Sequence, residues 1–209
     1  HCPDLDDEGS GDCTAMDNGG TCLATFVAET GVTLTDLVDS TIGSARWTVA
    51  LGDVVDVAVS PYGSCVAALD RSSHVHVIRD GAIVETWPTG FTKARRLCFV
   101  PTGESLVAAG EIASDVGGAK NEVRRFTLSG DVQGVFQGHG DFIWDMSFST
   151  DGERVATACR DRRVRLFDVI RPHYAHDIRE KFNLFINVIG GSPGFRRALS
   201  LDRGHCREQ

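Results

Sequence analysis

Four glycines in turn-like sequences recur along the chain at nearly regular intervals. Gly20, Gly63, Gly103 and Gly152 are separated by 43, 40 and 49 residues, and a short apolar run follows each of them. Units of roughly 40–45 residues that hold several short apolar runs are typical of repeated antiparallel sheets, not of helical solenoids. The spacing therefore predicts an all-β chain built from repeated units.

The unit at residues 138–169 shows this pattern most clearly. Its apolar runs alternate with polar residues, and turn-forming residues separate them. The three runs are 143–148, 154–158 and 164–168. Alternation with period two, together with an Asp-Gly turn between the first two runs, predicts a meander of antiparallel strands.

The same unit recurs earlier in the chain. Residues 53–79 align with residues 142–168 without a gap, and Asp56 falls on Asp145. Another copy contains a Gly-rich insertion at 110–122 between its second and third strands. Part of this insertion looks like a phosphate-binding loop, but it lacks the full GxxxxGK[ST] pattern and a following helix, so we assign no nucleotide site to it.

The unit at 138–169 opens with Gly138-His139 and closes with Phe167-Asp168, where a WD repeat has Gly-His and Trp-Asp. It resembles a WD-repeat (WD40) blade, the four-stranded unit of a β-propeller. The resemblance implies an all-β fold, an incomplete WD-repeat β-propeller made of four-stranded antiparallel blades. WD propellers usually close with seven blades, so the remaining blades are expected from missing parts of the same chain.

The resemblance also predicts how the chain is divided. The expected parts are an acidic segment or end of a preceding blade at 1–18, a partial blade at 19–51, a blade at 52–90, a blade with the insertion 110–122 at 91–137, a blade at 138–170, and a linker with the start of a further blade at 171–209.

In WD repeats a buried hydrogen-bonded set joins a histidine, a serine or threonine, an aspartate and a tryptophan. The resemblance assigns these roles to His139, Thr157, Asp161 and Phe167, although phenylalanine has no N–H to donate. A nucleophile–base–orienter set has similar residue types. Because a threonine inside a strand is a poorly exposed nucleophile, we expect a structural blade network and no catalytic residues.

The resemblance further implies that partners bind at loop ends and at the rim of the central channel. The residues that map there are Phe142, Trp144 and Arg160, with Asp53, Val55 and Arg71 in the matching unit. Aromatic and arginine side chains dominate the energetics of many interfaces. Trp144 fits a core position equally well, and both interpretations remain open.

Charge is distributed unevenly along the chain. The formal net charge of −8 argues against a general nucleic-acid binder. Arg46 is the only lysine or arginine before Pro61, whereas arginine dominates after Glu153. This asymmetry fits partner recognition or attraction between the two ends, and it fits a solvated polar surface equally well. No apolar run approaches the ~20 residues needed to span a bilayer.

The seven cysteines include no CxxC pair, and an odd count fits neither a zinc ribbon nor a paired disulfide framework. We therefore expect reduced cysteines in a cytoplasmic or nuclear protein. His74 and His76 share one face of a predicted strand. Since no third ligand has a useful spacing, we expect a polar strand face there, with no metal and no cofactor.

These features predict a non-enzymatic scaffold that docks other proteins or peptides on its surface. Fold does not dictate function, so this prediction rests on the resemblance. One alternative is a regulatory propeller of the vesicle-coat guanine-nucleotide exchange factor type, which acts on a small GTPase and also has a long insertion in one blade. The other is a propeller hydrolase or lyase, which needs acidic or histidine side chains clustered around the axis.

Overall fold

The computed structural model describes residues 13–39, 41–114, 120–169 and 175–177. These residues form sixteen strands in four antiparallel sheets of four strands each. The first sheet contains β1 (Cys13–Met16), β2 (Cys22–Val27), β3 (Gly31–Val38) and β4 (Thr41–Val49). The second contains β5 (Val54–Val59), β6 (Val66–Asp70), β7 (His74–Arg79) and β8 (Ala82–Pro88). The third contains β9 (Lys93–Phe99), β10 (Ser105–Ile112), β11 (Lys120–Thr127) and β12 (Val132–His139). The fourth contains β13 (Ile143–Phe148), β14 (Arg154–Cys159), β15 (Val164–Asp168) and β16 (Ala175–Asp177).

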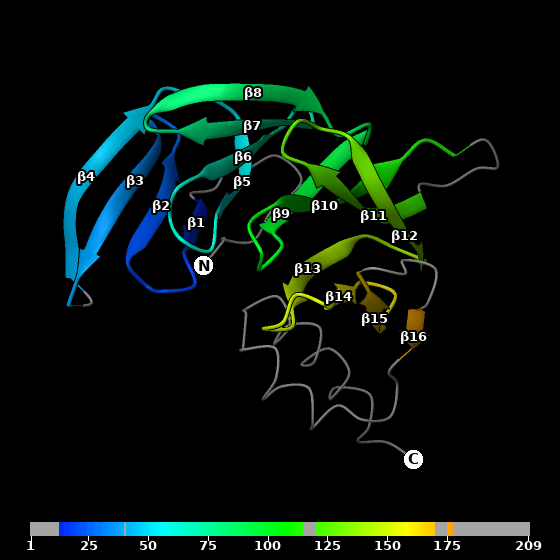
Figure 1. Ribbon diagram of the computed structural model, residues 1–209. Coiled ribbons are helices and arrows are strands. Elements are labelled where there is room, and N and C mark those ends of the chain that lie inside the picture. Colours follow the sequence, from blue (N-terminus) through cyan, green and yellow to red (C-terminus); the bar gives the residue numbers. More distant parts are fainter. Residues whose placement is uncertain (1–12, 40, 115–119, 170–174, 178–209) are drawn as a thin grey trace, which may run out of the picture.

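The four sheets follow one another like the blades of a propeller (Figure 1). Their first strands lie side by side, because β1 contacts β5, β5 contacts β9 and β9 contacts β13. The all-β fold of four-stranded antiparallel blades predicted from the sequence is confirmed. We call the end of the sheets at which β1, β5, β9 and β13 begin the loop end, and the opposite end the turn end.

The hydrophobic core lies between sheets, not within any one of them. One buried cluster joins the first and second sheets and includes Phe26 and Ile78. A second joins the second and third sheets through residues such as Leu69 and Phe126. The third joins the third and fourth sheets and includes Phe136. Each sheet therefore depends on its neighbour to bury its apolar face.

The recurring glycines occupy equivalent turns at the turn end. The backbone N–H of Gly63 donates to the carbonyl of Ser60 over 2.9 Å, and that of Gly152 donates to the carbonyl of Ser149 over 2.9 Å. Both glycines have a positive φ, 67° and 73°. This left-handed conformation suits glycine because glycine has no Cβ. The period seen in the sequence therefore reflects one repeated turn.

The described strands differ from the predicted divisions at three places. β1 belongs to the first sheet although it lies in the segment 1–18, because its residues pair with β2. β16 extends the fourth sheet beyond residue 170. Both ends of the predicted insertion 110–122 are paired strand, since Gly110 lies opposite Glu122 and Ile112 opposite Lys120 in a lengthened hairpin. The predicted start of a further blade, within 178–209, lies outside the described residues.

Two tryptophans on fourth strands pack against the outer hairpin of the following sheet. Trp87 lies against Gly130, and its Nε1 donates a hydrogen bond to the carbonyl of Leu128 over 3.0 Å. Trp47 lies against Gly81 in the same way, but its indole nitrogen makes no hydrogen bond with a described residue. These contacts join neighbouring sheets at their outer side.

Candidate interaction surface

A buried histidine–threonine pair lies at the centre of the predicted blade network. His139 Nε2 and Thr157 Oγ1 are 2.9 Å apart, and both residues are buried. The ring of Phe167 lies 5.5 Å from that of His139, centroid to centroid. Burial, with a smaller contribution from the positive charge of Arg165, lowers the pKa of His139 to about 4. The imidazole is therefore neutral at pH 7.

Asp161 pairs with an arginine instead of with the histidine. Its carboxylate accepts two hydrogen bonds from Arg165, at 3.2 and 2.7 Å, and one from the backbone N–H of Gly140 at 2.9 Å. Burial alone would raise the pKa of Asp161, but these hydrogen bonds outweigh it and hold the pKa at about 2. Within the described residues, Nδ1 of His139 has no hydrogen-bond partner.

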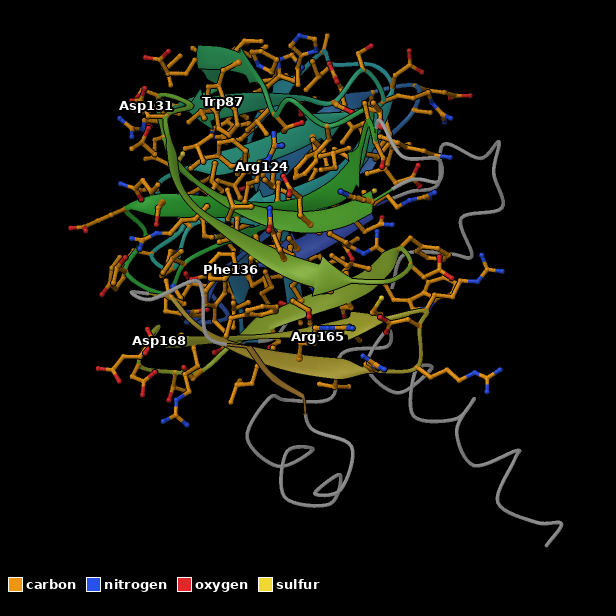
Figure 2. All side chains as sticks on the ribbon, turned by 90° about the vertical axis from the view of Figure 1, so that its right-hand side faces the viewer. Trp87, Arg124, Asp131, Phe136, Arg165 and Asp168 are labelled. Atoms are coloured by element: carbon orange, nitrogen blue, oxygen red, sulfur yellow. The ribbon has the colours of Figure 1, made fainter. Side chains whose placement is uncertain are left out.

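Arg165 was not singled out from the sequence, although it lies on the same strand as Phe167. It is 5% exposed, so its charge needs the carboxylate of Asp161. Arg124 holds the corresponding position in the third sheet and pairs with Glu122 at 2.6 Å. Figure 2 shows Arg124 and Arg165 on neighbouring sheets, with Asp131 and Asp168 toward the opposite end. The recurrence of arginine at the equivalent positions 124 and 165 is the feature of the sequence that could have identified this site.

Three of the predicted surface residues come together with Arg95 at the loop end, and we call the four residues the Phe142 cluster. The rings of Phe142 and Trp144 pack edge to face with centroids 4.2 Å apart. The guanidinium carbon of Arg95 lies 4.9 Å from the centre of the Phe142 ring, and that of Arg160 lies 5.4 Å from it. Such cation–π contacts favour arginine over lysine.

A β-bulge positions the tryptophan of this cluster. The pairing of β13 with β14 shifts register between Ile143 and Asp145, so Trp144 is the extra residue. The pairing of β5 with β6 shifts in the same way at Val55. A bulge re-aims the side chain of the extra residue. Trp144 is half-buried and lies outside the buried core clusters, so it takes neither a full core position nor a fully exposed one.

Contacts between the third and fourth sheets hold the Phe142 cluster in place. Arg96 donates from Nε to the carbonyl of Trp144 over 2.8 Å. Arg95 also pairs with Glu111 at 2.9 Å. The backbone N–H of Arg160 donates to the carbonyl of Phe142 over 2.9 Å, while the side chain of Arg160 remains 60% exposed. The cluster is therefore a largely fixed surface with one accessible guanidinium.

The other predicted surface residues lie two sheets away. The backbone N–H of Arg71 donates to the carbonyl of Asp53 over 2.7 Å, and both side chains are exposed. Val55 is half-buried, and its carbonyl accepts a hydrogen bond from the thiol of Cys13 over 3.2 Å. Because β9 separates β5 from β13, the six predicted residues form two groups on the loop end.

Comparison with known families bears directly on the fourth sheet. The family described as WD domain, G-beta repeat matches residues 130–168, which hold β12 to β15. The match falls on the unit that carries the blade network, and three further sheets repeat its topology. The chain thus contains a WD repeat at residues 130–168, and its described residues form four blades in a β-propeller arrangement.

Two known proteins are similar to this chain, one in sequence and one in fold alone. It is similar to Coronin-7 of Rattus norvegicus, with 29% identity over 140 residues, which is 63% of this chain and 14% of that protein. In fold it is similar to a chain of the Kuenenia stuttgartiensis Hydrazine Synthase, with a TM-score of 0.58 and 19% identity. That similarity covers 75% of this chain and 50% of the other. This chain thus spans a small part of the length of Coronin-7 and half of the length of the hydrazine synthase chain.

The histidines of the second blade lie beside a carboxylate. His76 Nε2 is 3.0 Å from Oδ2 of Asp70, and its Nδ1 is 3.1 Å from the hydroxyl of Thr86. No group of three or more His, Cys, Asp or Glu side chains in the described part of the propeller is placed to hold a metal ion. Both ring nitrogens of His76 are thus engaged by polar side chains of its own blade.

The described cysteines are Cys13, Cys22, Cys65, Cys98 and Cys159, and all five are free thiols. Burial raises the pKa of Cys159 to about 11, which keeps that thiol protonated and weakly reactive at neutral pH. Across the described blades there is no helix with the length and apolar character needed to cross a bilayer.

Proposed function

We propose that this propeller is a non-enzymatic docking platform whose partner, a protein or a peptide, binds the Phe142 cluster at the loop end. The supporting observation is the arrangement of Phe142 between the guanidinium groups of Arg95 and Arg160, with Trp144 against its edge. Aromatic and arginine side chains on a rigid support carry most of the binding energy in many interfaces. Here two blades supply that support.

Burial of the blade network supports a structural role for it. Thr157 is fully buried, and its hydroxyl is engaged by His139. A nucleophile needs access to substrate and a base with a pKa near the working pH. The buried Thr157 has no such access. The pKa of His139, about 4, lies far below neutral pH. The network therefore fits a role in holding the blade together better than a role in catalysis.

Affinity capture with matched variants tests the docking proposal. Phe142→Ala removes the ring between the two arginines, whereas Tyr62→Ala removes an 85% exposed aromatic ring at the turn end. Truncation of an interface hot spot costs about 2 kcal/mol or more, which weakens binding roughly thirty-fold. We expect quantitative mass spectrometry to find a partner that Phe142→Ala loses and Tyr62→Ala keeps. Equal recovery by both variants contradicts the proposed surface.

The exchange-factor alternative remains a prediction from sequence. The paired part of 110–122 is a lengthened hairpin, which fixes no partner. The described residues give no specific support to the hydrolase or lyase alternative either, so neither is proposed as a second function.

A further inference from the structure

Basic residues gather on one side of the loop end. In the third and fourth blades, nine Lys and Arg residues accompany five Asp and Glu residues in the described parts of 93–96, 111–124, 137–145 and 159–165. In the first and second blades, the described residues at the loop end include Arg71 with Glu29, Asp53, Asp56 and Asp70. The Phe142 cluster therefore lies within a positively charged area that does not extend to the first two blades.

Arg160 presents a guanidinium group that is already oriented. It lies over the ring of Phe142, 5.4 Å from the ring centre, and its side chain is 60% exposed. The carboxylate of Asp141 is 3.9 Å away, and an exposed ion pair of that length contributes little. A guanidinium that stacks on a ring keeps the N–H groups at its edge free, and it loses less entropy on binding. Arg160 can thus donate hydrogen bonds to an incoming carboxylate.

Arg162 holds a backbone conformation that its side-chain type disfavours. Its φ is 66°, in the left-handed region that residues with long side chains rarely adopt. Ser73 holds the equivalent turn position in the second blade with a φ of 65°, and its hydroxyl accepts a hydrogen bond from the backbone N–H of Ala94. The exposed side chain of Arg162, in contrast, makes no hydrogen bond or ion pair with any described residue. The described blades gain no contact from this guanidinium, which is therefore open to a ligand.

The acidic side of the loop end restricts what the basic area can bind. A nucleic acid or a membrane surface is an extended polyanion, so it would also meet the exposed side chains of Glu29 and Asp53. The formal net charge of −8 adds to this repulsion. A short acidic segment of a protein fits on the third and fourth blades alone and avoids the repulsion.

We propose that the Phe142 cluster and Arg162 bind a short acidic segment of a partner protein, with one carboxylate on Arg160 and a second on Arg162. In an extended segment, side chains at alternate positions lie on one face about 7 Å apart, a spacing that two arginines of one turn can meet. The inference names the chemical class of the partner and rests on the proposed function. Phe142 holds Arg160 in place, so both the ring and the guanidinium contribute to binding.

Fluorescence anisotropy on the full chain tests the proposal. The probe is a labelled peptide of alternating glutamate and glycine, and the control is the same peptide with glutamine in place of glutamate. We expect the glutamate peptide to bind at least about tenfold more tightly, because hydrogen bonds to charged groups are the stronger ones. The difference should shrink as salt rises from about 50 to about 300 mM. Equal binding of the two peptides, or binding of neither, overturns the proposal.

A labelled single-stranded oligonucleotide of similar charge separates the two classes of polyanion. It should bind less tightly than the glutamate peptide, because it extends over the acidic side of the loop end. Tighter binding of the oligonucleotide overturns the assignment to an acidic protein segment.

Paired arginine variants locate the site. Arg160→Gln with Arg162→Asn should lower the affinity for the glutamate peptide at least about tenfold, and asparagine accepts the positive φ at residue 162. The matched control, Arg79→Gln with Arg154→Gln, removes the same charge from exposed residues at the turn end and should leave binding unchanged. Equal losses in the two paired variants overturn the assignment to the loop end.

The stability of Arg162→Asn gives a measurement that does not depend on a ligand. Asparagine adopts the left-handed conformation more readily than arginine does, so urea denaturation should give an unchanged or higher midpoint. A lower midpoint would show that Arg162 serves the fold, and that result overturns its assignment to a ligand.

The outcome is separable from that of the proposed function. If the glutamate peptide fails to bind while Phe142→Ala still loses the captured partner, docking at the Phe142 cluster stands and only the acidic chemistry is wrong. If the peptide binds through Arg160 and Arg162 while Phe142→Ala and Tyr62→Ala recover the same proteins, the acidic-segment site stands and the docking proposal is wrong.

Discussion

Trp87 of the second blade donates a hydrogen bond from its indole N–H to the carbonyl oxygen of Leu128 in the third blade. The indole also packs against Phe126, with ring centroids 4.9 Å apart. Two residues 41 positions apart in sequence thus join an outer strand to the outer hairpin of the next blade. The contact shows that neighbouring blades are coupled through specific polar bonds as well as through apolar burial.

Replacement of Trp87 by phenylalanine should lower the free energy of unfolding by about 1–2 kcal/mol. The change keeps a buried ring but leaves the carbonyl of Leu128 without this donor, and a lost hydrogen bond costs about that much. Urea denaturation measures the effect. Trp47→Phe is the matched control, since Trp47 packs on Gly81 and its indole nitrogen makes no hydrogen bond within the described residues. Equal losses in the two variants would show that ring volume, not the hydrogen bond, matters.

Replacement of Thr157 by valine should destabilise the fourth blade by about 1–3 kcal/mol. Valine matches the shape of threonine but leaves Nε2 of the buried His139 without its partner, and an unsatisfied buried polar group costs about this much. Thermal melts compare it with Thr157→Ser, which keeps the hydroxyl. A valine variant more stable than the serine variant would contradict the structural role of the pair.

Acidification should destabilise the protein between about pH 6.5 and pH 4 because of His139. Its folded pKa of about 4 lies below the ordinary value of 6.5, so the unfolded chain binds the proton first and gains population as the pH falls. The full effect is about 3 kcal/mol. Chemical denaturation at several pH values should show the free energy of unfolding falling with pH in this window. The variant His139→Gln should show a smaller dependence. An unchanged slope in the variant would assign the effect to other groups.

A second pH window belongs to Asp161. Its folded pKa of about 2 lies below the ordinary value of 3.8, so the stabilisation from Arg165 is complete above about pH 4. It is lost as the pH falls toward 2, and it amounts to about 2 kcal/mol. Asp161→Asn should remove the dependence in this window and lower stability at pH 7. Retention of the wild-type slope below pH 4 would exclude this pair as its source.

Alanine at Gly63 should destabilise the chain more than alanine at Gly20. Both glycines have a positive φ, 67° and 65°, which costs alanine about 1 kcal/mol. A Cβ at residue 63 would also lie 2.5 Å from the sulfur of Cys22, whereas a Cβ at residue 20 meets nothing within 4 Å. Urea denaturation of the two variants should give free energies of unfolding that differ by about 1 kcal/mol. Equal losses of stability in the two variants would mean that the first blade shifts at Cys22 to make room for the added Cβ.

The sequence allowed the repeat to be predicted because the turn chemistry is local. Gly63 and Gly152 indicate a turn conformation that depends on few neighbouring residues. The alternation of apolar and polar residues in 143–148 likewise predicts one strand. β1 escaped prediction because its four residues give little signal and become a strand by pairing with β2. β16 is equally short and is defined by its pairing with β15.

The site was predictable to a smaller degree. The resemblance to a WD repeat placed Phe142, Trp144 and Arg160 near one surface. The contact of Arg95 with Phe142 depends on the offset between two blades, which no local pattern encodes. Likewise, Arg165 draws Asp161 away from His139 through long side chains whose directions follow from tertiary packing.

The buried clusters that join each pair of sheets bear on how chain length can change. A lone sheet of this kind has no interior, so it gains stability only beside a neighbour. Insertion or deletion of a whole repeat keeps every remaining interface of the same type, whereas loss of one strand exposes half of an interface to water. Length variation in steps of about one repeat is consequently the kind that this architecture tolerates.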